Sequence, residues 1–304
     1  MTRISIIICT FNRAPLLELA LNSIANQTTA PYEVLVIDNK STDNTNELVS
    51  VFQNTIPYLK YYYEENIGLS QARNRGVRES SGDYLAFIDD DCILPNNWVD
   101  LAYHLIENKN PDVFGGPVFP FYEKRKPRWF IDRYLTFEFG SSTRKLYHFE
   151  TLIGCNFIIR KSVIERIGEF RVDLGMTGTK VLYSEETELQ LRYLNSQLSK
   201  GIYYDPDLYV HHYARPDKLS LLWNIKAFIG KGKSNYRTKN IQIKKQWFRS
   251  FFELAIQLLK VAYFFSIGAL FRNRTKYPFY QNYIMERVQG HLKKYGFLLE
   301  QFRS

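Results

Sequence analysis

Cysteine is scarce in this chain of 304 residues, which carries only Cys9, Cys92 and Cys155. An odd number of widely spaced cysteines fits neither a disulfide framework nor a zinc-binding pattern. Cys9 and Cys155 lie in apolar runs, where a free cysteine usually serves as a small buried residue. We therefore expect the protein to work in a reducing compartment.

The sequence also lacks an internal repeat, a low-complexity tract and a segment typical of a leader peptide. Thr2 and Arg3 run directly into the apolar residues 4–9, which leaves no room for a signal peptide. We therefore expect a cytoplasmic chain, long enough for one large domain with an appendage.

Acidic residues are nearly absent from the last part of the chain. Residues 218–304 carry 17 Lys and Arg against 3 Asp and Glu, a balance of +14, whereas residues 1–217 have a balance of −5. We predict a catalytic domain over residues 1–217 and a basic helical extension over residues 218–304, which suits an anionic partner. No nucleic-acid recognition motif accompanies this charge, so we expect no nucleic-acid partner.

Apolar, β-branched runs alternate with helical patterns in the first part of the chain. The spacing predicts strands at residues 4–9, 33–38, 59–63 and 84–88, and helices at about 15–27, from the 41–43 cap to 53, and 70–79. This alternation predicts right-handed βαβ units and an α/β fold with a mostly parallel, doubly wound central sheet.

The pattern is less regular beyond Pro111. Three prolines and a charge run between residues 117 and 128 predict a long surface excursion, and residues 175–178 predict a mobile loop. Order returns with a predicted strand at 155–160 and predicted helices near 162–166 and 184–195.

Polar motifs follow three of the predicted strands: residues 10–13, Asp38–Asn39 and Asp89–Asp91. Ligands of a doubly wound sheet bind beyond the carboxyl ends of its strands, so these motifs are expected to share one crevice. Three carboxylates there repel one another unless a cation lies among them, and Mg²⁺ or Mn²⁺ prefers such oxygen ligands. The alternative is a solvated acidic turn, which the position at a strand end argues against.

Two later motifs complete the candidate chemistry. Glu185 and Glu186 open a predicted helix, where acidic residues often do no more than complement the helix dipole. Transfer to a hydroxyl acceptor, however, needs a carboxylate that takes the acceptor's proton. His212 follows a short strand-like run and is either an ordinary histidine or a nitrogen ligand that completes the metal site.

Six segments resemble, in order, the motifs of family 2 glycosyltransferases. They are residues 6–13 (IIICTFNR), 36–43 (VIDNKSTD), 66–76 (NIGLSQARNRG), 87–91 (FIDDD, similar to the family's Asp-x-Asp motif), 154–157 (GCNF) and 184–189 (SEETEL). The likeness covers about residues 3–234. It implies a GT-A fold and inverting transfer of a sugar from a nucleotide-sugar, commonly a UDP-sugar.

The same resemblance implies roles for individual residues. The donor-binding residues would be Thr10, Asn12, Arg13, Asp38, Asn39, Gly68, Arg73, Asp89 and Asp90, with Asp38 on the base and Asp89 by the ribose and diphosphate. The ligands of Mn²⁺ or Mg²⁺ would be Asp91, Asp89 and His212. Glu186 stands where the family usually has a catalytic Asp and is one methylene longer, so Glu185 stays an alternative base.

Two other functions use related sites. A sugar nucleotidyltransferase also combines a nucleotide-binding sheet with metal-binding carboxylates, but it typically has a glycine-rich phosphate loop, and residues 10–13 contain no glycine. A non-catalytic protein that binds a nucleotide-sugar would keep the pocket without the base.

Polar residues form a narrow stripe along a predicted apolar helix at 241–265. They are Gln242, Lys245, Gln246, Arg249, Glu253, Gln257 and Lys260. The stripe favours a helix that lies on an anionic membrane surface through residues 241–271, whereas residues 248–271 are also long enough to span, and packing on the catalytic domain is a third alternative. We expect a peripheral enzyme on the cytoplasmic face of a membrane, with a carbohydrate or lipid-linked acceptor, in polysaccharide or glycolipid assembly.

Overall fold

The computed structural model describes residues 2–177, 183–238 and 247–303, with the side chains of 247–250 excepted. The chain separates into two compact units. The first comprises Met1–Phe121, Leu135–Asp173 and Glu185–Tyr213, and the second Tyr122–Tyr134, Leu174–Ser184 and Ala214–Ser304. The second unit thus includes the segments Tyr122–Tyr134 and Leu174–Ser184, which precede residue 217. The division into a catalytic domain of residues 1–217 and an extension of residues 218–304 stays a prediction.

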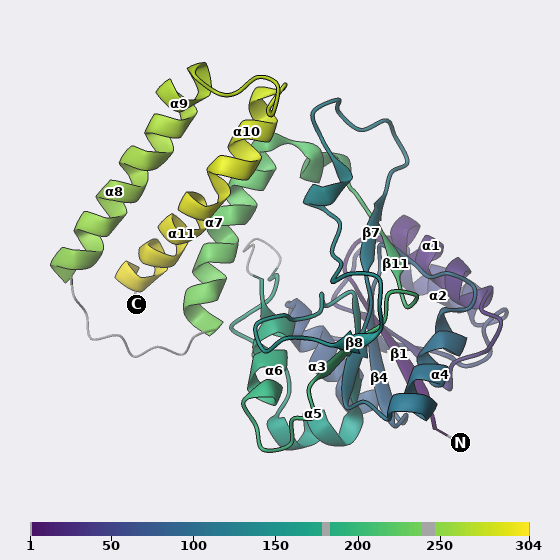
Figure 1. Ribbon diagram of the computed structural model, residues 1–304. Coiled ribbons are helices and arrows are strands. Elements are labelled where there is room, and N and C mark those ends of the chain that lie inside the picture. Colours follow the sequence, from purple (N-terminus) through teal and green to yellow (C-terminus); the bar gives the residue numbers. More distant parts are fainter. Residues whose placement is uncertain (1, 178–182, 239–246, 304) are drawn as a thin grey trace. The chain divides into compact units, whose positions relative to one another are not determined.

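An eight-stranded sheet forms the centre of the first unit (Figure 1). Its strands, in spatial order, are β3 (Leu59–Tyr63), β2 (Glu33–Asp38), β1 (Ile4–Thr10), β4 (Tyr84–Asp89), β9 (Asn156–Arg160), β6 (Val113–Gly115), β10 (Ile202–Tyr204) and β8 (Arg144–Lys145). Only β9 and β8 run against the others. The predicted mostly parallel α/β sheet is therefore confirmed.

Helices cover both faces of this sheet (Figure 1). One face carries α1 (Ala14–Ala25), α2 (Thr45–Phe52) and α4 (Trp98–Lys109), and the other carries α3 (Leu69–Glu79), α5 (Lys161–Ile167) and α6 (Glu185–Leu194). Along β1, Ile6 and Ile8 pack into the first of these layers, whereas Ile7 packs into the second. Burial on both faces explains why the strand is a continuous β-branched run rather than an alternating one.

The order of the strands places the switch point of the sheet at the ends of β1 and β4. From β1 the chain proceeds outward through β2 and β3 and then returns to add β4 on the other side. The two central strands are parallel, with Cys9 opposite Asp89. Thr10 and the acidic triplet therefore lie side by side at the ends of these strands, at the switch point where doubly wound sheets bind their ligands.

A smaller sheet joins β5 (Cys92–Ile93), β11 (Val210–Tyr213) and β7 (Val118–Phe121). The prediction of a surface excursion that begins at residue 117 is wrong for β7, which pairs with β11. Pro120 is compatible with this strand because β7 lies on the outer side of the sheet, where a missing N–H donor is tolerated.

The second unit is helical. Its elements are η1 (Asp132–Tyr134), η2 (Pro216–Leu219), α7 (Leu221–Thr238), α8 (Trp247–Phe265), α9 (Ile267–Leu270), α10 (Tyr280–Arg287) and α11 (Gln289–Arg303). Helices α7 and α11 approach closely because glycines line the contact: a Cβ added to Gly296 would lie 2.1 Å from the carbonyl oxygen of Ile229. Arg237 Nε also donates to Glu300 Oε1 across this pair at 2.8 Å.

Helix α8 points part of its polar stripe toward α11 and leaves its apolar side uncovered. Gln257 is buried, with Oε1 2.9 Å from His291 Nδ1, and Glu253 forms an ion pair with Lys294 at 3.6 Å. The exposed apolar residues of α8 are Phe251, Phe252, Ile256, Leu258, Leu259 and Tyr263, and those in and directly after α9 are Ile267, Leu270 and Phe271. By length and composition, Phe251–Leu270 is sufficient to cross a membrane, and only 11% of it is buried. The stripe positions Gln242, Lys245 and Gln246 lie outside the described residues.

Candidate active site

The acidic triplet divides into residues with different surroundings. The Asp89 side chain is 34% exposed, whereas those of Asp90 and Asp91 are each 3% exposed. Asp90 accepts hydrogen bonds from Thr10 Oγ1 at 2.9 Å and Arg13 Nη1 at 3.0 Å. Burial raises the pKa of Asp90 to about 6, and Asp91 adds to this rise while Arg13 opposes it. The middle carboxylate therefore ties the end of β4 to the motif that follows β1.

His212 reaches the triplet through the small sheet. In the antiparallel pairing of β11 with β5, His212 lies opposite Cys92, and the backbone N–H of Tyr213 donates to the carbonyl oxygen of Asp91 at 2.8 Å. His212 Nε2 consequently lies 3.1 Å from Asp91 Oδ1. Ligand atoms of Asp89, Asp91 and His212 all fall within 4.8 Å of one another. Two carboxylates and an imidazole are a donor set that fits Mn²⁺ or Mg²⁺.

Arg73 on α3 connects this cluster to the start of α6. Its buried guanidinium lies 2.6 Å (Nη1) from Glu185 Oε1 and 3.3 Å (Nη2) from Asp89 Oδ1, and Nη2 donates to the carbonyl oxygen of Gly154 at 3.2 Å. Burial on its own would lower the pKa of Arg73, but the carboxylates of Glu185 and Asp89 outweigh it and raise this pKa. Arg73 is therefore permanently charged and holds both carboxylates in place.

Glu186 lies beside this ion pair and has a raised pKa. Burial, followed by repulsion from Glu185, raises the pKa of Glu186 to about 8, although Arg73 pulls it down. A Cβ added to Gly154 would lie 2.8 Å from Arg73 Nη2 and 3.2 Å from Glu186 Cγ, so a larger residue there would displace the Arg73 guanidinium. A carboxylate whose pKa is near neutrality suits a general base.

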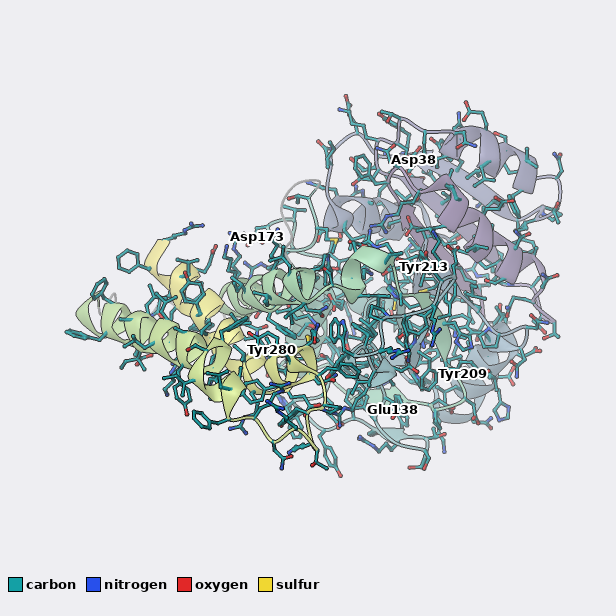
Figure 2. The ribbon with its side chains drawn as sticks, turned by 90° about the horizontal axis from the view of Figure 1, so that it is seen from above. Asp38, Glu138, Asp173, Tyr209, Tyr213 and Tyr280 are labelled. Carbon is teal, nitrogen blue, oxygen red and sulfur yellow. The ribbon has the colours of Figure 1, made fainter. Side chains whose placement is uncertain are left out.

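Two predicted residues, Asp38 and Asn12, hold the loop that follows β2. Asp38 accepts hydrogen bonds from the Ser41 backbone N–H at 2.8 Å and from the Tyr61 hydroxyl at 2.7 Å. Asn12, at a positive φ of 53°, accepts from the Thr42 backbone N–H at 2.6 Å. Asp38 and Tyr213, both labelled in Figure 2, are the last residues of β2 and β11.

Asn39 positions the start of α3. Its Nδ2 donates to the carbonyl oxygen of Asn66 at 2.7 Å, and its Oδ1 accepts from the Gly68 backbone N–H at 2.7 Å. Gly68 precedes α3 with a φ of 150°, which few other residues adopt. The helix that carries Arg73 is thereby attached to the end of β2.

Sequence reasoning missed three participants at this edge of the sheet. Tyr61 lies on β3, where its hydroxyl binds Asp38, and nothing in the alternation of that strand indicates the partner. Gly154 was recognised only as part of a motif, and its place between Arg73 and Glu186 requires the fold. Cys92 was discounted because of its spacing, although the pairing of β5 with β11 sets it opposite His212.

A comparison with known families matches the description "Glycosyl transferase family 2" to residues 5–168, more than half of the chain. The chain belongs to glycosyl transferase family 2. The resemblance seen in the sequence is thus confirmed, and the matched residues contain every strand-end motif from Thr10 to Asp91.

Individual relatives agree with this family. Glycosyltransferase AglE of Haloferax volcanii is 32% identical over 171 residues, which are 55% of this chain and 55% of AglE. Glycosyltransferase GlyA of Streptococcus pneumoniae is 27% identical over 74% of this chain and 32% of GlyA. The matched region therefore spans about half the length of AglE and a third of that of GlyA.

Solved structures of other glycosyltransferases share the fold. The mannosyltransferase PcManGT of Pyrobaculum calidifontis, solved with GDP-Man and Mn²⁺, has a TM-score of 0.65 at 17% identity and covers 95% of this chain and 84% of its own. S. aureus TarS 1–349, solved with UDP-GlcNAc, has a TM-score of 0.58 at 18% identity and covers 99% and 90%. The expected GT-A fold of this family 2 member is confirmed.

Proposed function

We propose that this family 2 member is a metal-dependent, inverting glycosyltransferase that moves a sugar from a nucleotide-sugar, commonly a UDP-sugar, to a hydroxyl acceptor. The observation that carries the proposal is the convergence of Asp89, Asp91 and His212 within 4.8 Å at the switch point of the sheet. A separate carboxylate with a raised pKa, Glu186, lies near Arg73 beside Gly154. The cluster of Asp89, Asp91 and His212 thus suits a diphosphate and its cation, and Glu186 suits the hydroxyl group of an acceptor.

The cation would be held by Asp89, Asp91 and His212. When bound, Mn²⁺ or Mg²⁺ supplies positive charge that stabilises the departing nucleotide diphosphate. Asp90 accepts hydrogen bonds from Thr10 and Arg13. It would therefore orient Asp89 and Asp91 rather than bind the cation itself. Arg13 lies 3.9 Å from Asp91 and adds a fixed positive charge beside the same cluster.

Donor recognition involves the residues at the other strand ends. We assign the hydrogen bond to the nucleotide base to Asp38, which is held by Tyr61 and Ser41 at the end of β2. The remaining donor-binding residues of the proposal are Thr10, Asn12, Arg13, Asn39, Gly68, Arg73, Asp89 and Asp90. The solved relatives were crystallised with UDP-GlcNAc or GDP-Man, which supports a nucleotide-sugar donor and leaves the base and sugar to experiment.

Glu186 is the proposed base. Its carboxylate takes the proton of the acceptor hydroxyl while the acceptor oxygen bonds to the anomeric carbon and the bond from that carbon to the diphosphate oxygen breaks. A single displacement from the face opposite the leaving group inverts the anomeric configuration. Glu185 is bound to Arg73 at 2.6 Å and serves as its counter-ion, so we assign the proton transfer to Glu186 rather than to Glu185.

Helix α8 supports a peripheral membrane location for this enzyme. A helix that packed conventionally on the rest of its unit would bury its apolar side, whereas α8 turns Gln257 inward and exposes residues such as Phe252 and Leu259. The surrounding segment is basic, with 17 Lys and Arg against 3 Asp and Glu in residues 218–304. An apolar face next to cationic residues suits the surface of an anionic bilayer. A lipid-linked or polysaccharide acceptor would be accessible there.

The experiment that tests the function is a donor screen on the full chain. We expect one nucleotide-sugar to raise the melting temperature in the presence of Mn²⁺ and much less in EDTA, since a ligand at 100 times its dissociation constant stabilises by about 2.7 kcal/mol. The same donor should then be consumed when acceptors are supplied. Stabilisation without any transfer or hydrolysis would favour a non-catalytic binding protein, and pyrophosphate release from a nucleoside triphosphate would favour a nucleotidyltransferase.

A further inference from the structure

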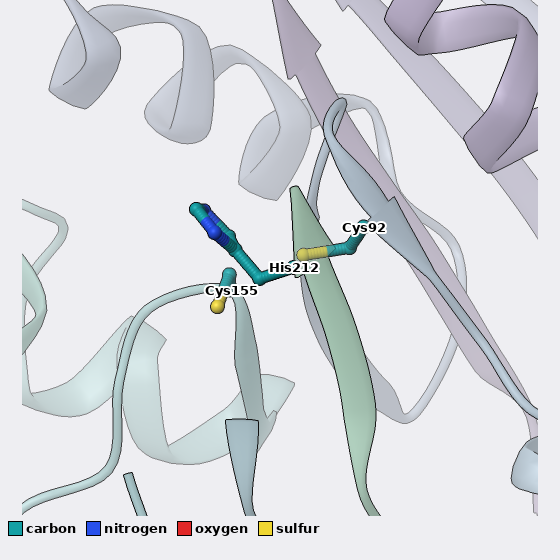
Figure 3. A group of neighbouring side chains, drawn as sticks. All are labelled: Cys92, Cys155 and His212. Carbon is teal, nitrogen blue, oxygen red and sulfur yellow. The ribbon is translucent and has the colours of Figure 1, made fainter. Parts of the chain in front are cut away.

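Two cysteines and a histidine that are distant in the sequence meet beside the carboxylate cluster. Cys92 begins β5, Cys155 directly precedes β9, and His212 lies in β11. Figure 3 shows the three side chains as neighbours, each on a different segment. The two sulfur atoms and an imidazole nitrogen all lie within 4.8 Å of one another.

The chemistry of this group differs from that of the neighbouring carboxylates. Thiolate and imidazole are ligands of soft or borderline ions such as Zn²⁺, whereas Mn²⁺ and Mg²⁺ prefer oxygen. Ligands of one zinc ion lie about 2.0–2.3 Å from it and hence no more than about 4.6 Å apart, so the group needs only a small adjustment. Cys92 and Cys155 are both buried, and the partly exposed His212 offers a route from solvent.

His212 belongs to two candidate ligand sets. It stands with Cys92 and Cys155 in one and with Asp89 and Asp91 in the other. Its Nε2 lies 3.1 Å from Asp91 Oδ1, so it is directed toward the carboxylates in this structure. An ion held by the two sulfurs would take this imidazole as a ligand and would place positive charge beside the carboxylates, which opposes the binding of a second cation there.

We propose that Cys92, Cys155 and His212 form a binding site for a thiophilic divalent cation such as Zn²⁺, and that occupancy of this site weakens the binding of Mn²⁺ or Mg²⁺ at Asp89 and Asp91. Both thiols release their protons to solvent as the ion binds. The first half of the inference stands on the three side chains alone. The second half rests on the proposed function, because it requires the hard-cation site.

Cadmium is the probe for the first half. Cd²⁺ added to the full chain under reducing conditions should produce an ultraviolet thiolate-to-metal absorption band. We expect Cys92→Ala and Cys155→Ala each to weaken Cd²⁺ binding by more than about tenfold, because loss of even an outer-sphere partner has effects of 10–100-fold. Cys9→Ala is the matched control, since Cys9 lies outside the group, and it should retain the band. Circular dichroism identifies any variant that fails to fold. One folded cysteine variant is enough to test the site.

The result that overturns the site is equally direct. A wild-type chain without the band, or a band that survives in a folded Cys92→Ala or Cys155→Ala variant, contradicts the proposal. His212→Ala should also weaken Cd²⁺ binding, which a pair of thiols acting without the histidine would not predict.

Competition between ions tests the second half. Paramagnetic resonance of Mn²⁺ should show its affinity falling by about tenfold or more when one equivalent of Zn²⁺ is bound, in the wild-type chain and in Cys9→Ala. In Cys155→Ala the effect of Zn²⁺ should disappear. Equal competition in Cys155→Ala would mean that Zn²⁺ enters the carboxylate site itself and would overturn the coupling. A chain with the cadmium band but no Mn²⁺ binding would overturn the hard-cation site of the proposed function while supporting the thiol site.

Discussion

Arg73 Nη1 lies 2.6 Å from Glu185 Oε1, while Nη2 of the same guanidinium lies 3.3 Å from Asp89 Oδ1. One buried cation thus joins the helix α3, the end of β4 and the start of α6. The contact also separates two adjacent glutamates, because Glu185 is paired with Arg73 whereas Glu186 has a pKa raised to about 8. These different surroundings support the different roles that we propose for the two glutamates.

Removing the guanidinium should destabilise the first unit strongly. Arg73→Met leaves the buried Glu185 without its counter-ion, and breaking one side of a buried pair lowers stability by about 3–5 kcal/mol. Urea unfolding followed by tryptophan fluorescence measures the change. Arg75→Met is the matched control, because its pair with Glu79 is partly exposed and should contribute no more than about 1 kcal/mol. Equal losses in the two variants would contradict the central position of Arg73.

Glu186→Gln should abolish transfer while donor binding stays nearly intact. The amide cannot take the acceptor's proton, and positioned bases contribute about 10²–10⁴-fold to the rate. Steady-state kinetics should show the loss in kcat with little change in the donor KM. Glu188→Gln on the same helix is the control, since Glu188 pairs with Arg192 and should keep its turnover. Turnover like that of the wild type in Glu186→Gln would exclude this residue as the base.

The rate should rise with pH through about 8. Burial and the neighbouring Glu185 favour the protonated form of Glu186, while Arg73 opposes them, and the net pKa is about 8. A base works only when ionised, so kcat/KM should fall about tenfold for each pH unit below that value. The measurement is kcat/KM at pH values from about 6 to 9, a range that brackets this pKa. Circular dichroism checks the fold at each pH. A flat profile would argue against Glu186.

The sequence predicted the central sheet well because its strands are buried on both faces. Continuous β-branched runs such as residues 4–9 are typical of strands covered on both faces, and the helices between them have regular apolar spacing. The strand-end motifs followed from the same logic, since parallel strands present their carboxyl ends at one edge. Asp90 shows the limit: its bonds to Thr10 and Arg13 depend on the register of β1 and β4.

Features that depend on short, distant strands were not predictable. The strand β5 has only two residues, too few to produce a pattern, yet its pairing with β11 brings His212 to Asp91. The apolar helix at the C-terminal end was predicted, but not its rotation. Periodicity predicts a polar stripe but not its partner, and in the structure Gln257 faces inward, where it is hydrogen-bonded to His291 on α11.

Asp91→Asn should remove metal-dependent nucleotide binding. The amide keeps the volume of the side chain and loses the charge that a hard cation requires. Calorimetric titration with a nucleoside diphosphate, with and without Mn²⁺, should show metal-enhanced binding in the wild-type chain and none in the variant. Asp100→Asn serves as the control, because Asp100 bonds Thr28 and Thr29 away from the triplet. Activity that persists without metal would count against the whole assignment.

The uncovered side of α8 should attach the protein to anionic membranes. Leu259 of α8 and Phe271, which follows α9, are 71% and 83% exposed, so replacing both with Glu should leave the fold intact. Burying each side chain in lipid contributes about 1.5–3 kcal/mol, so the double variant should lose more than about tenfold in partitioning. Flotation with phosphatidylglycerol vesicles measures this partitioning. Val51→Glu, which alters an exposed apolar residue of the first unit, should float like the wild type.

If the wild-type chain stays in the dense fraction, or if all three proteins float equally, α8 is not a membrane-binding helix. Resistance of the wild-type chain to alkaline extraction from cell membranes would instead indicate that residues 251–270 span the bilayer.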